Sequence, residues 1–228
     1  MNIKSTTFII LMGLLTTITL AGSIWFSLYL TGPNSINRTR ILPANNDVLA
    51  FVAAFASYLG GGALWGLGIA RMTKTDVKTM VKACALSWGL TVLIFAGTLG
   101  LSLGLIFTFG NTITIRFNYY YLLIILPVIG IVTGINGRTV IVKLGLRELK
   151  NKAGLNIGLA AVLGFLAVSL ILQFGFGLEV GKPVGRYEHL TLLHWCNIGA
   201  ALVGGMVLGK ELVNSKNSLA ENVSPGVA

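Results

Sequence analysis

Apolar residues run along this chain in six long stretches that are separated by short polar segments. The stretches cover residues 6–30, 48–70, 83–109, 119–142, 153–178 and 190–209. About 20 apolar residues in a helix cross the ~30 Å hydrocarbon core of a bilayer, and each stretch reaches that length. The pattern therefore predicts an all-α fold, a polytopic membrane bundle of six transmembrane helices joined by short loops.

Composition supports this interpretation and limits the number of domains. Of the 228 residues, 54% are hydrophobic and only 11% are charged, and the mean hydropathy is +0.82. Such values are unnecessary in a water-soluble domain and leave no room for one. We predict a transmembrane domain over residues 1–210 and a cytoplasmic tail over 211–228, whose polar composition and Pro225 favour disorder.

The chain has a net charge of +10, and the positions of its cations relative to the six predicted spans indicate its orientation in the membrane. With the N-terminus inside, the inner segments hold twelve cations: Lys4, Arg71, Lys74, Lys78, Lys82, Arg138, Lys143, Arg147, Lys150, Lys152, Lys210 and Lys216. The outer segments hold five: Arg38, Arg40, Arg116, Lys182 and Arg186. Because cytoplasmic loops carry the excess of Lys and Arg, this asymmetry predicts that both termini are cytoplasmic.

Six of the inner cations form two stripes at helical spacing. The stripes are Lys74, Lys78 and Lys82 in one segment, and Lys143, Arg147 and Lys150 in the next. Near a membrane surface each cation attracts anionic headgroups by about 1 kcal/mol. We therefore expect these residues to contact membrane lipids or the acidic face of a soluble partner, and we expect no nucleic acid partner. Between the second and third spans, Thr73 and Asp76 predict a capping box that starts the third helix.

Glycine is abundant, and many of the 29 glycines are spaced four residues apart inside the predicted spans. Small residues one turn apart let helix backbones approach closely, which matters in lipid because little hydrophobic force brings helices together there. The predicted packing pairs are Gly62 and Gly66, Gly130 and Gly134, and Gly205 and Gly209. The same faces also suit a homo-oligomer or docking to another membrane subunit.

A weak internal repeat suggests how the spans are grouped. Small residues followed by a cation recur at a period of about 70 residues, for example Gly62 and Gly66 before Arg71, and Gly130 and Gly134 before Arg138. This period favours three hairpin repeats. A three-plus-three inverted repeat, which is common among transporters, remains open.

The four tryptophans fall near the ends of the predicted spans. Trp25 and Trp195 lie near outer ends, while Trp65 and Trp88 lie near inner ends. Because tryptophan prefers the headgroup level of a bilayer, we interpret all four as interfacial anchors.

Residues able to perform chemistry are scarce inside the spans. No Asp or Glu lies in the middle of any predicted stretch, which disfavours ion-coupled transport through buried carboxylates. The candidate functional polar residues are Arg138, Asn136, Gln173 and Asn197. Arg138 either extends its flexible stem to the cytoplasmic headgroups or serves a functional site. His194 is a weak candidate ligand for a haem or pigment, and no motif implies a metal or a catalytic residue.

Three function classes follow from these patterns. The abundance of small-residue faces and the scarcity of ionisable groups favour a non-catalytic structural, assembly or accessory subunit of a larger membrane complex. A channel or carrier for a small solute or ion is the first alternative, because a path lined by backbone and hydroxyl groups needs no charge. An intramembrane enzyme is the second alternative.

Overall fold

The computed structural model describes residues 5–31, 47–109, 117–146, 150–178 and 186–222. All regular structure in these ranges is helical: α1 (Ser5–Thr31), α2 (Asp47–Thr73), α3 (Val77–Phe109), α4 (Phe117–Lys143), α5 (Lys150–Leu170), the short π-helix η2 (Ile171–Gly175) and α6 (Arg186–Asn222). The predicted all-α fold is confirmed. Arg147, from one of the predicted cation stripes, lies outside the described residues.

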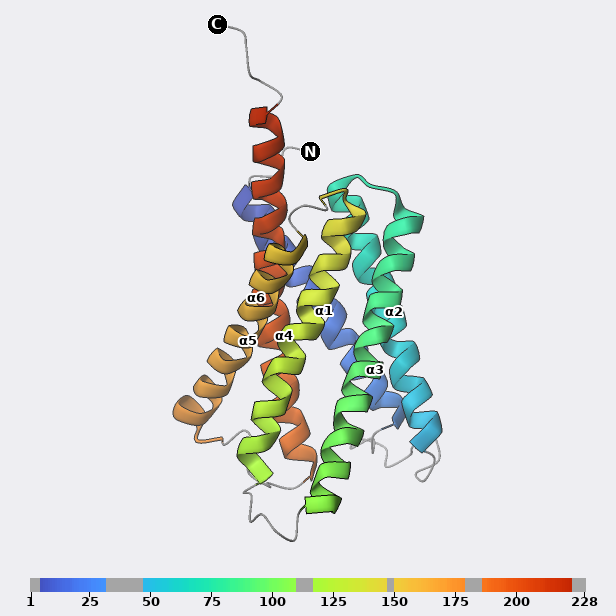
Figure 1. Ribbon diagram of the computed structural model, residues 1–228, viewed down its shortest axis with the longest axis vertical. Helices are drawn as coiled ribbons and strands as arrows, with labels where there is room; N and C mark the ends of the chain where they lie inside the picture. The colour runs from blue at the N-terminus through green and yellow to red at the C-terminus, as the bar shows by residue number, and fades with distance from the viewer. Residues whose placement is uncertain (1–4, 32–46, 110–116, 147–149, 179–185, 223–228) are drawn as a thin grey trace, which may run out of the picture.

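Six of these helices are long and apolar enough to cross a membrane. The spans within them are Ser5–Ser27, Phe51–Thr73, Val77–Thr98, Ile124–Lys143, Asn151–Gly175 and Leu192–Ser215. Because each span is at least 20 residues long and predominantly apolar, as a bilayer crossing requires, the chain is an integral membrane protein. The first residues of α1 and the last residues of α6 lie at the same end of the bundle, together with the end of α2 and the start of α3 (Figure 1). We call this end the terminal end.

The helices pack in a ring in which each contacts its neighbours in sequence, and α6 closes the ring against α1. The contacts between α2 and α3, and between α4 and α5, are more extensive than those between α1 and α2 or between α3 and α4. Of the three predicted hairpins, α5–α6 is among the most extensive contacts, whereas α1–α2 and α3–α4 pack less extensively than α2–α3 and α4–α5. The α3–α4 contact is the least extensive of those around the ring.

The predicted glycine pairs lie where two helices approach closely. Gly62 and Gly66 face α3, Gly130 and Gly134 face α5, and Gly205 and Gly209 face α1. A Cβ atom added to Gly62 would lie 2.6 Å from the carbonyl oxygen of Cys84, and one added to Gly134 would lie 2.7 Å from that of Gly154. Backbone atoms fill the space that a side chain would need, so these interfaces require glycine.

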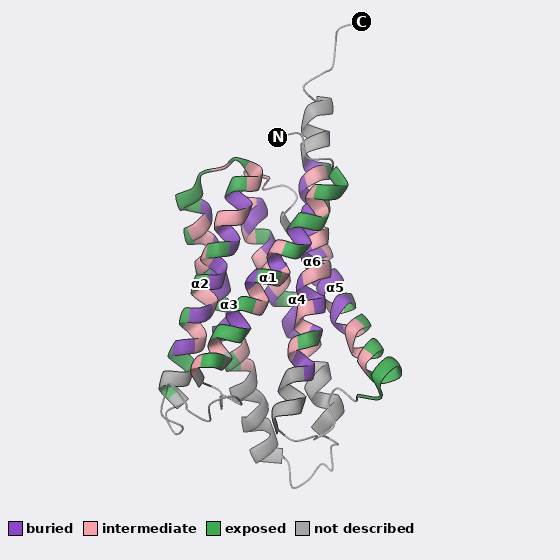
Figure 2. Ribbon diagram, turned by 180° about the vertical axis from the view of Figure 1, so that it is seen from behind, coloured by how far each residue is buried: buried purple, intermediate pink, exposed green. Residues whose placement is uncertain are grey.

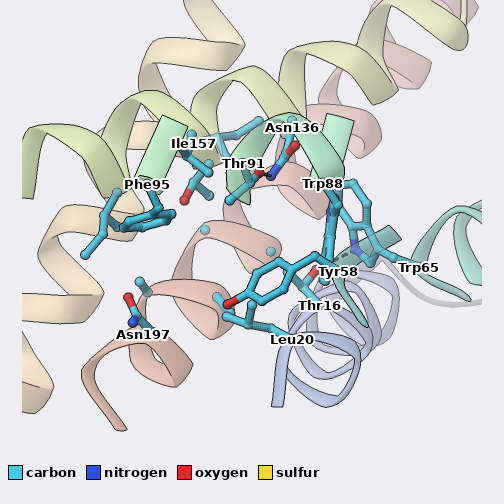
Figure 3. Close-up of a pocket in the computed structure, with 18 of the residues that line it drawn as sticks. Thr16, Leu20, Tyr58, Trp65, Trp88, Thr91, Phe95, Asn136, Ile157 and Asn197 are labelled. Carbon is cyan, nitrogen blue, oxygen red and sulfur yellow. Dashed lines mark hydrogen bonds between the residues drawn. The ribbon is translucent and has the colours of Figure 1, made fainter. Parts of the chain in front are cut away.

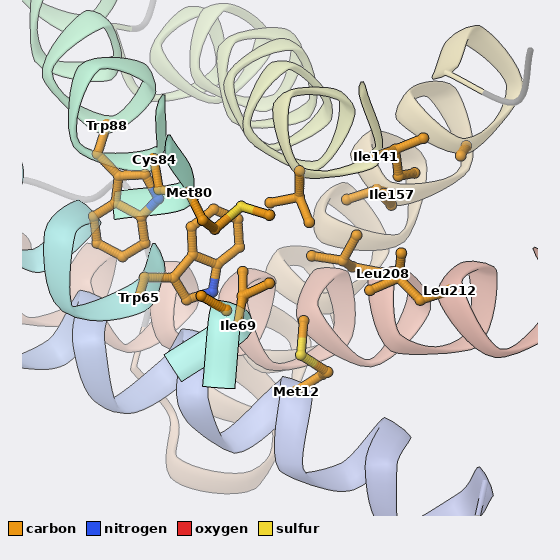
Figure 4. Packing of buried hydrophobic residues seen from close by; sticks show 13 residues of the cluster. Met12, Trp65, Ile69, Met80, Cys84, Trp88, Ile141, Ile157, Leu208 and Leu212 are labelled. Carbon is orange, nitrogen blue, oxygen red and sulfur yellow. The ribbon is translucent and has the colours of Figure 1, made fainter. Parts of the chain in front are cut away.

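Apolar side chains from all six helices converge near the terminal end of the bundle (Figure 4). We call this cluster the apolar plug: Met12, Trp65, Ile69, Ala70, Met80, Cys84, Trp88, Val140, Ile141, Ala153, Ile157, Leu208 and Leu212. Every member is buried, and most are no more than 2% exposed. Figure 2 shows the buried residues on the inward faces of the helices and the exposed residues on their outer faces.

The two central tryptophans differ from the sequence interpretation. Trp25 and Trp195 are 66% and 55% exposed, as lipid anchoring requires, but Trp65 and Trp88 are only 2% and 4% exposed. The interpretation of Trp65 and Trp88 as interfacial anchors is therefore wrong. Their position near span ends along the chain gave no information about which way the rings face, and both rings point into the bundle.

The start of α3 also differs from the predicted capping box. Asp76 itself caps the helix, since its Oδ2 accepts a 2.8 Å hydrogen bond from the backbone N–H of Thr79. Thr73 belongs to the last turn of α2, where its hydroxyl donates to the carbonyl oxygen of Ile69. Side-chain and backbone hydrogen bonds from Thr79 lower the pKa of Asp76 below its ordinary value.

Helix α6 crosses the domain boundary predicted at residue 210 and continues to Asn222. Leu212 and Ser215 are buried against the bundle. Asn156 of α5 donates a 2.8 Å hydrogen bond from Nδ2 to Oε1 of Glu211. These contacts hold residues after 210 in the helix, and the polar composition of the segment did not reveal them.

Candidate functional site

A cavity of about 250 Å³ lies inside the ring, near the centre of the spans (Figure 3). All six helices line it: Thr16, Leu20, Tyr58, Trp65, Trp88, Thr91, Phe95, Ile125, Ile129, Val132, Thr133, Asn136, Gly137, Ile157, Leu193, His194, Asn197, Ala200, Ala201, Gly204, Gly205 and Leu208. Four of these residues, Trp65, Trp88, Ile157 and Leu208, also belong to the apolar plug. The plug therefore forms the floor of the cavity on the terminal side.

The lining combines apolar side chains with neutral polar groups. No Asp, Glu, Lys or Arg is among the described residues that surround the cavity. Its polar side chains are Thr16, Tyr58, Trp65, Trp88, Thr91, Thr133, Asn136, His194 and Asn197. A mostly apolar pocket with a few polar groups is typical of small-molecule sites.

Three aromatic rings from α2 and α3 form one wall of this cavity. The ring centroids of Trp65 and Trp88 are 5.5 Å apart at an interplanar angle of 40°, and those of Tyr58 and Trp88 are 6.4 Å apart at 51°. Trp65 Nε1 donates a 2.9 Å hydrogen bond to Thr16 Oγ1, which in turn donates to the carbonyl oxygen of Met12. This chain of bonds fixes the Trp65 ring against α1.

Asn136 connects α4 to α3 at the edge of the cavity. Its Oδ1 accepts a hydrogen bond from Ser87 Oγ, and its Nδ2 donates a 3.2 Å bond to Thr91 Oγ1. The hydroxyl oxygens of Ser87 and Thr139 lie 3.3 Å apart beside this pair. Hydrogen bonds therefore hold the α3–α4 contact, where no glycine pair was predicted.

Trp88 differs from its neighbours in having an unused donor. Its side chain is 4% exposed, and its Nε1 is the buried side-chain polar atom without a hydrogen-bond partner among the described residues. A buried N–H left without an acceptor costs about 1–3 kcal/mol. The Trp88 ring therefore borders the cavity, but its donor nitrogen is itself buried and has no acceptor in the described part of the chain.

The structure separates the sequence-predicted polar candidates into two groups. Asn136 of α4 and the two α6 residues His194 and Asn197 all line the cavity. Gln173 is exposed in η2, and Arg138 is exposed on α4. Neither residue lines the cavity.

The candidate cation stripes are only partly described. Lys74, Lys78, Lys82 and Lys143 are exposed at the terminal end of the bundle. Lys150 is the first residue of α5, but its side chain lies outside the described residues. Lys74, Lys78, Lys82 and Lys143 are not among the residues that line the cavity.

Several cavity residues were not identified by sequence reasoning. Tyr58, Thr16 and Thr91 are polar groups within apolar stretches, and Trp88 was assigned to the membrane surface. A usable signal was the occurrence of Thr16, Tyr58 and Thr91 inside the first three predicted spans, where each hydrogen-bonding group requires a partner.

Neither a metal site nor a similarity to a known protein assigns a function to the cavity. No group of three or more His, Cys, Asp or Glu that could hold a metal ion occurs among the residues described. Comparisons with protein families, curated proteins and solved structures give no match. The fold and site together define an integral membrane protein with an uncharged internal cavity.

Proposed function

We propose that this protein is a carrier for a small uncharged solute, which binds in the central cavity. The main support for this proposal is the cavity, which has a volume of about 250 Å³. Aromatic rings, hydroxyls and amides border it near the middle of the spans. One water molecule needs only about 10–15 Å³ of such volume. The space is therefore suited to a solute of several atoms.

The apolar plug favours a carrier over an open channel. It fills the bundle between the cavity and the terminal end, and all six helices contribute to it. Met12, Ile69 and Leu208 within it are at most 1% exposed. Because close-packed side chains leave no path for a solute, release on this side requires the helices to rearrange.

The same structure weakens the two other function classes. The glycine pairs that favoured a subunit of a larger complex pack against helices of this chain, so they no longer indicate an external partner. For an enzyme, the described cavity lining supplies no Asp or Glu to pair with His194 and no Cys or Ser nucleophile. Of its threonines, Thr16 and Thr91 donate their hydroxyls to backbone carbonyl oxygens. A carrier gives the polar and aromatic residues of the cavity a role, which neither a complex subunit nor an enzyme does.

Uptake into proteoliposomes tests the proposal. Vesicles containing the purified protein should accumulate radiolabelled uracil or nicotinamide faster than protein-free vesicles, with a rate that saturates as the solute concentration rises. Nicotinate, the charged analogue of nicotinamide, should show no acceleration, because the cavity offers its carboxylate no counter-charge. Equal uptake with and without protein for every uncharged solute would rule out the carrier, and a rate that never saturates would indicate a channel.

A matched pair of variants tests whether solute uptake depends on the cavity. Thr133→Phe places a ring in the cavity, which Thr133 lines, and should reduce uptake at least tenfold. Thr6→Phe makes the same change at an exposed position of α1 and should leave uptake unchanged. Thermal unfolding of both variants in detergent verifies that the bundle has formed.

A further inference from the structure

We infer that the cavity binds a small neutral amide or lactam, and that Asn197 recognises the edge of the solute on which its N–H and carbonyl groups lie side by side. The inference rests on the proposed carrier function and specifies the chemical class of the solute. Three observations support it: accessible polar groups without partners, their positions on two helices, and the absence of charged residues around the described cavity.

The polar side chains of the lining fall into two sets. The first set is bonded to other groups of the protein: Thr16, Trp65, Thr91 and Asn136. The second set makes no side-chain hydrogen bond within the described part of the chain: Tyr58, Thr133, His194 and Asn197. These four side chains are half-buried, and their polar atoms are accessible, unlike the buried Nε1 of Trp88. They keep their hydrogen-bonding capacity for a molecule in the cavity.

Asn197 is the member of the second set that best matches an amide. A side-chain amide holds a carbonyl acceptor next to an amino donor, so it pairs with the N–H and carbonyl groups of another amide through two parallel bonds. The neutral imidazole of His194 has its donor and its acceptor on separate ring nitrogens and cannot form both bonds with one amide edge. The hydroxyls of Tyr58 and Thr133 place donor and acceptor on a single oxygen.

Tyr58 faces the solute from another helix. It belongs to α2, whereas Asn197 belongs to α6, and α1 packs against both helices. In Figure 3 the Tyr58 hydroxyl points to the side of the cavity from which Asn197 projects. Because a carbonyl oxygen has two lone pairs, the solute oxygen accepts one bond from Asn197 Nδ2 and a second from Tyr58, while the solute N–H donates to Asn197 Oδ1. The bound solute thereby connects α2 to α6.

The preference for a neutral solute follows from the rest of the lining. The described residues around the cavity include no Asp, Glu, Lys or Arg to pair with an ionised solute. Moving an unpaired charge to the centre of a membrane is costly, whereas a neutral amide loses far less hydration. An amide or lactam therefore uses the polar groups of the cavity without that cost.

Three six-membered ring probes separate these requirements. δ-Valerolactam carries an N–H and a carbonyl on one edge, cyclohexanone keeps the carbonyl and has CH₂ in place of the N–H, and piperidinium carries a charge. Titration calorimetry of the full-length protein in lipid nanodiscs, with empty nanodiscs as the background, should show that δ-valerolactam binds about tenfold more tightly than cyclohexanone, the size expected for one hydrogen bond. Piperidinium should show no binding in the same concentration range.

Matched variants test whether Asn197 is responsible. In Asn197→Leu the ratio of δ-valerolactam to cyclohexanone affinity should fall from about ten to about one, because both partners of the amide edge are gone. Asn136→Leu makes the same change in the same cavity, but the ratio should persist, since Asn136 is bonded to Ser87 and Thr91. If Asn197→Leu fails to fold, Asn197→Thr keeps a polar side chain and still lacks the paired donor and acceptor.

Tyr58→Phe has a different expected signature. It removes only the hydroxyl, which bonds to a carbonyl group that both δ-valerolactam and cyclohexanone possess. Both affinities should therefore weaken by a similar factor of about ten at most, and their ratio should stay the same. A change in the ratio without a change in cyclohexanone affinity would overturn the assignment of Tyr58 to the carbonyl oxygen.

The remaining outcomes separate the inference from the proposed function. An unchanged ratio in the Asn197 variants would overturn the inference, and so would loss of the ratio in His194→Phe with Asn197→Leu unaffected. Tighter binding of piperidinium than of δ-valerolactam would overturn the charge argument. Saturable uptake of uncharged solutes without binding of δ-valerolactam would reject the solute class and leave the carrier intact, whereas absence of both would reject the carrier as well.

Discussion

Helix α4 has two contrasting faces, and each contacts a neighbouring helix in a different way. Toward α5, Gly134 lies against the backbone of Gly154 and Gly158, and Gly130 lies against Val162 and the backbone of Gly158. Toward α3, the contact is less extensive and depends on the bonds that Asn136 makes. Close packing around glycine therefore stabilises the contact with α5, whereas a few hydrogen bonds stabilise the contact with α3.

For the proposed carrier, this difference predicts which contact changes during transport. Backbone contacts at the glycine face involve many atoms that must separate together, and packed interfaces tolerate little gradual deformation. Hydrogen bonds at the α3 face can be exchanged for bonds to water or to a solute at a modest net cost. Since that face also borders the cavity, we expect α3 and α4 to move apart while α4 and α5 move as a unit.

The largest effect is expected at the glycine face. Gly134→Ala places a methyl group 2.7 Å from the carbonyl oxygen of Gly154, a backbone atom that cannot move alone. We expect a loss of about 1–3 kcal/mol in stability from overpacking, measured as a lower melting temperature in detergent, and a larger loss for Gly134→Leu.

Gly22→Ala is the control for this prediction, because no atom lies within 4 Å of an added Cβ at Gly22. Its melting temperature should stay the same or rise slightly, since alanine has the higher helix propensity. Equal melting of the two alanine variants would show that α4 and α5 do not depend on close backbone contact.

An intermediate effect is expected at the hydrogen-bonded face. Asn136→Ala removes the acceptor for Ser87 and the donor for Thr91, which should lower stability by about 1–2 kcal/mol. The same variant should change the uptake rate by several-fold, because it loosens the contact that we expect to open. Gln173→Ala removes an exposed amide and should alter neither quantity, so a similar response of both variants would contradict the assigned role of Asn136.

The smallest effect is expected outside both contacts. Arg138 is exposed, and Lys provides a similar apolar stem and the same charge. Arg138→Lys should therefore change the melting temperature and the uptake rate very little, within about 0.5 kcal/mol. A variant that accumulates normally but loses uptake would show that the guanidinium group binds a partner that the cavity does not explain.

The sequence alone determined the membrane class, the number of spans and the positions suited to close helix packing. These features depend on local properties: twenty apolar residues reach across a bilayer wherever they occur, and a glycine lacks a side chain whatever it faces. The six predicted stretches correspond to the six helical spans, and Asn136, Asn197 and His194 were named as candidates because residues able to perform chemistry are scarce inside the spans.

The tertiary structure decided which of these residues meet. Trp65 and Trp88 lie near span ends in the sequence, but the rotation of α2 and α3 turns both rings into the bundle. Glu211 extends α6 beyond the predicted boundary through its bond with Asn156, a residue 55 positions earlier. The cavity exists because six helices close into a ring, and no local pattern in the sequence specifies the order or the rotation in which helices pack.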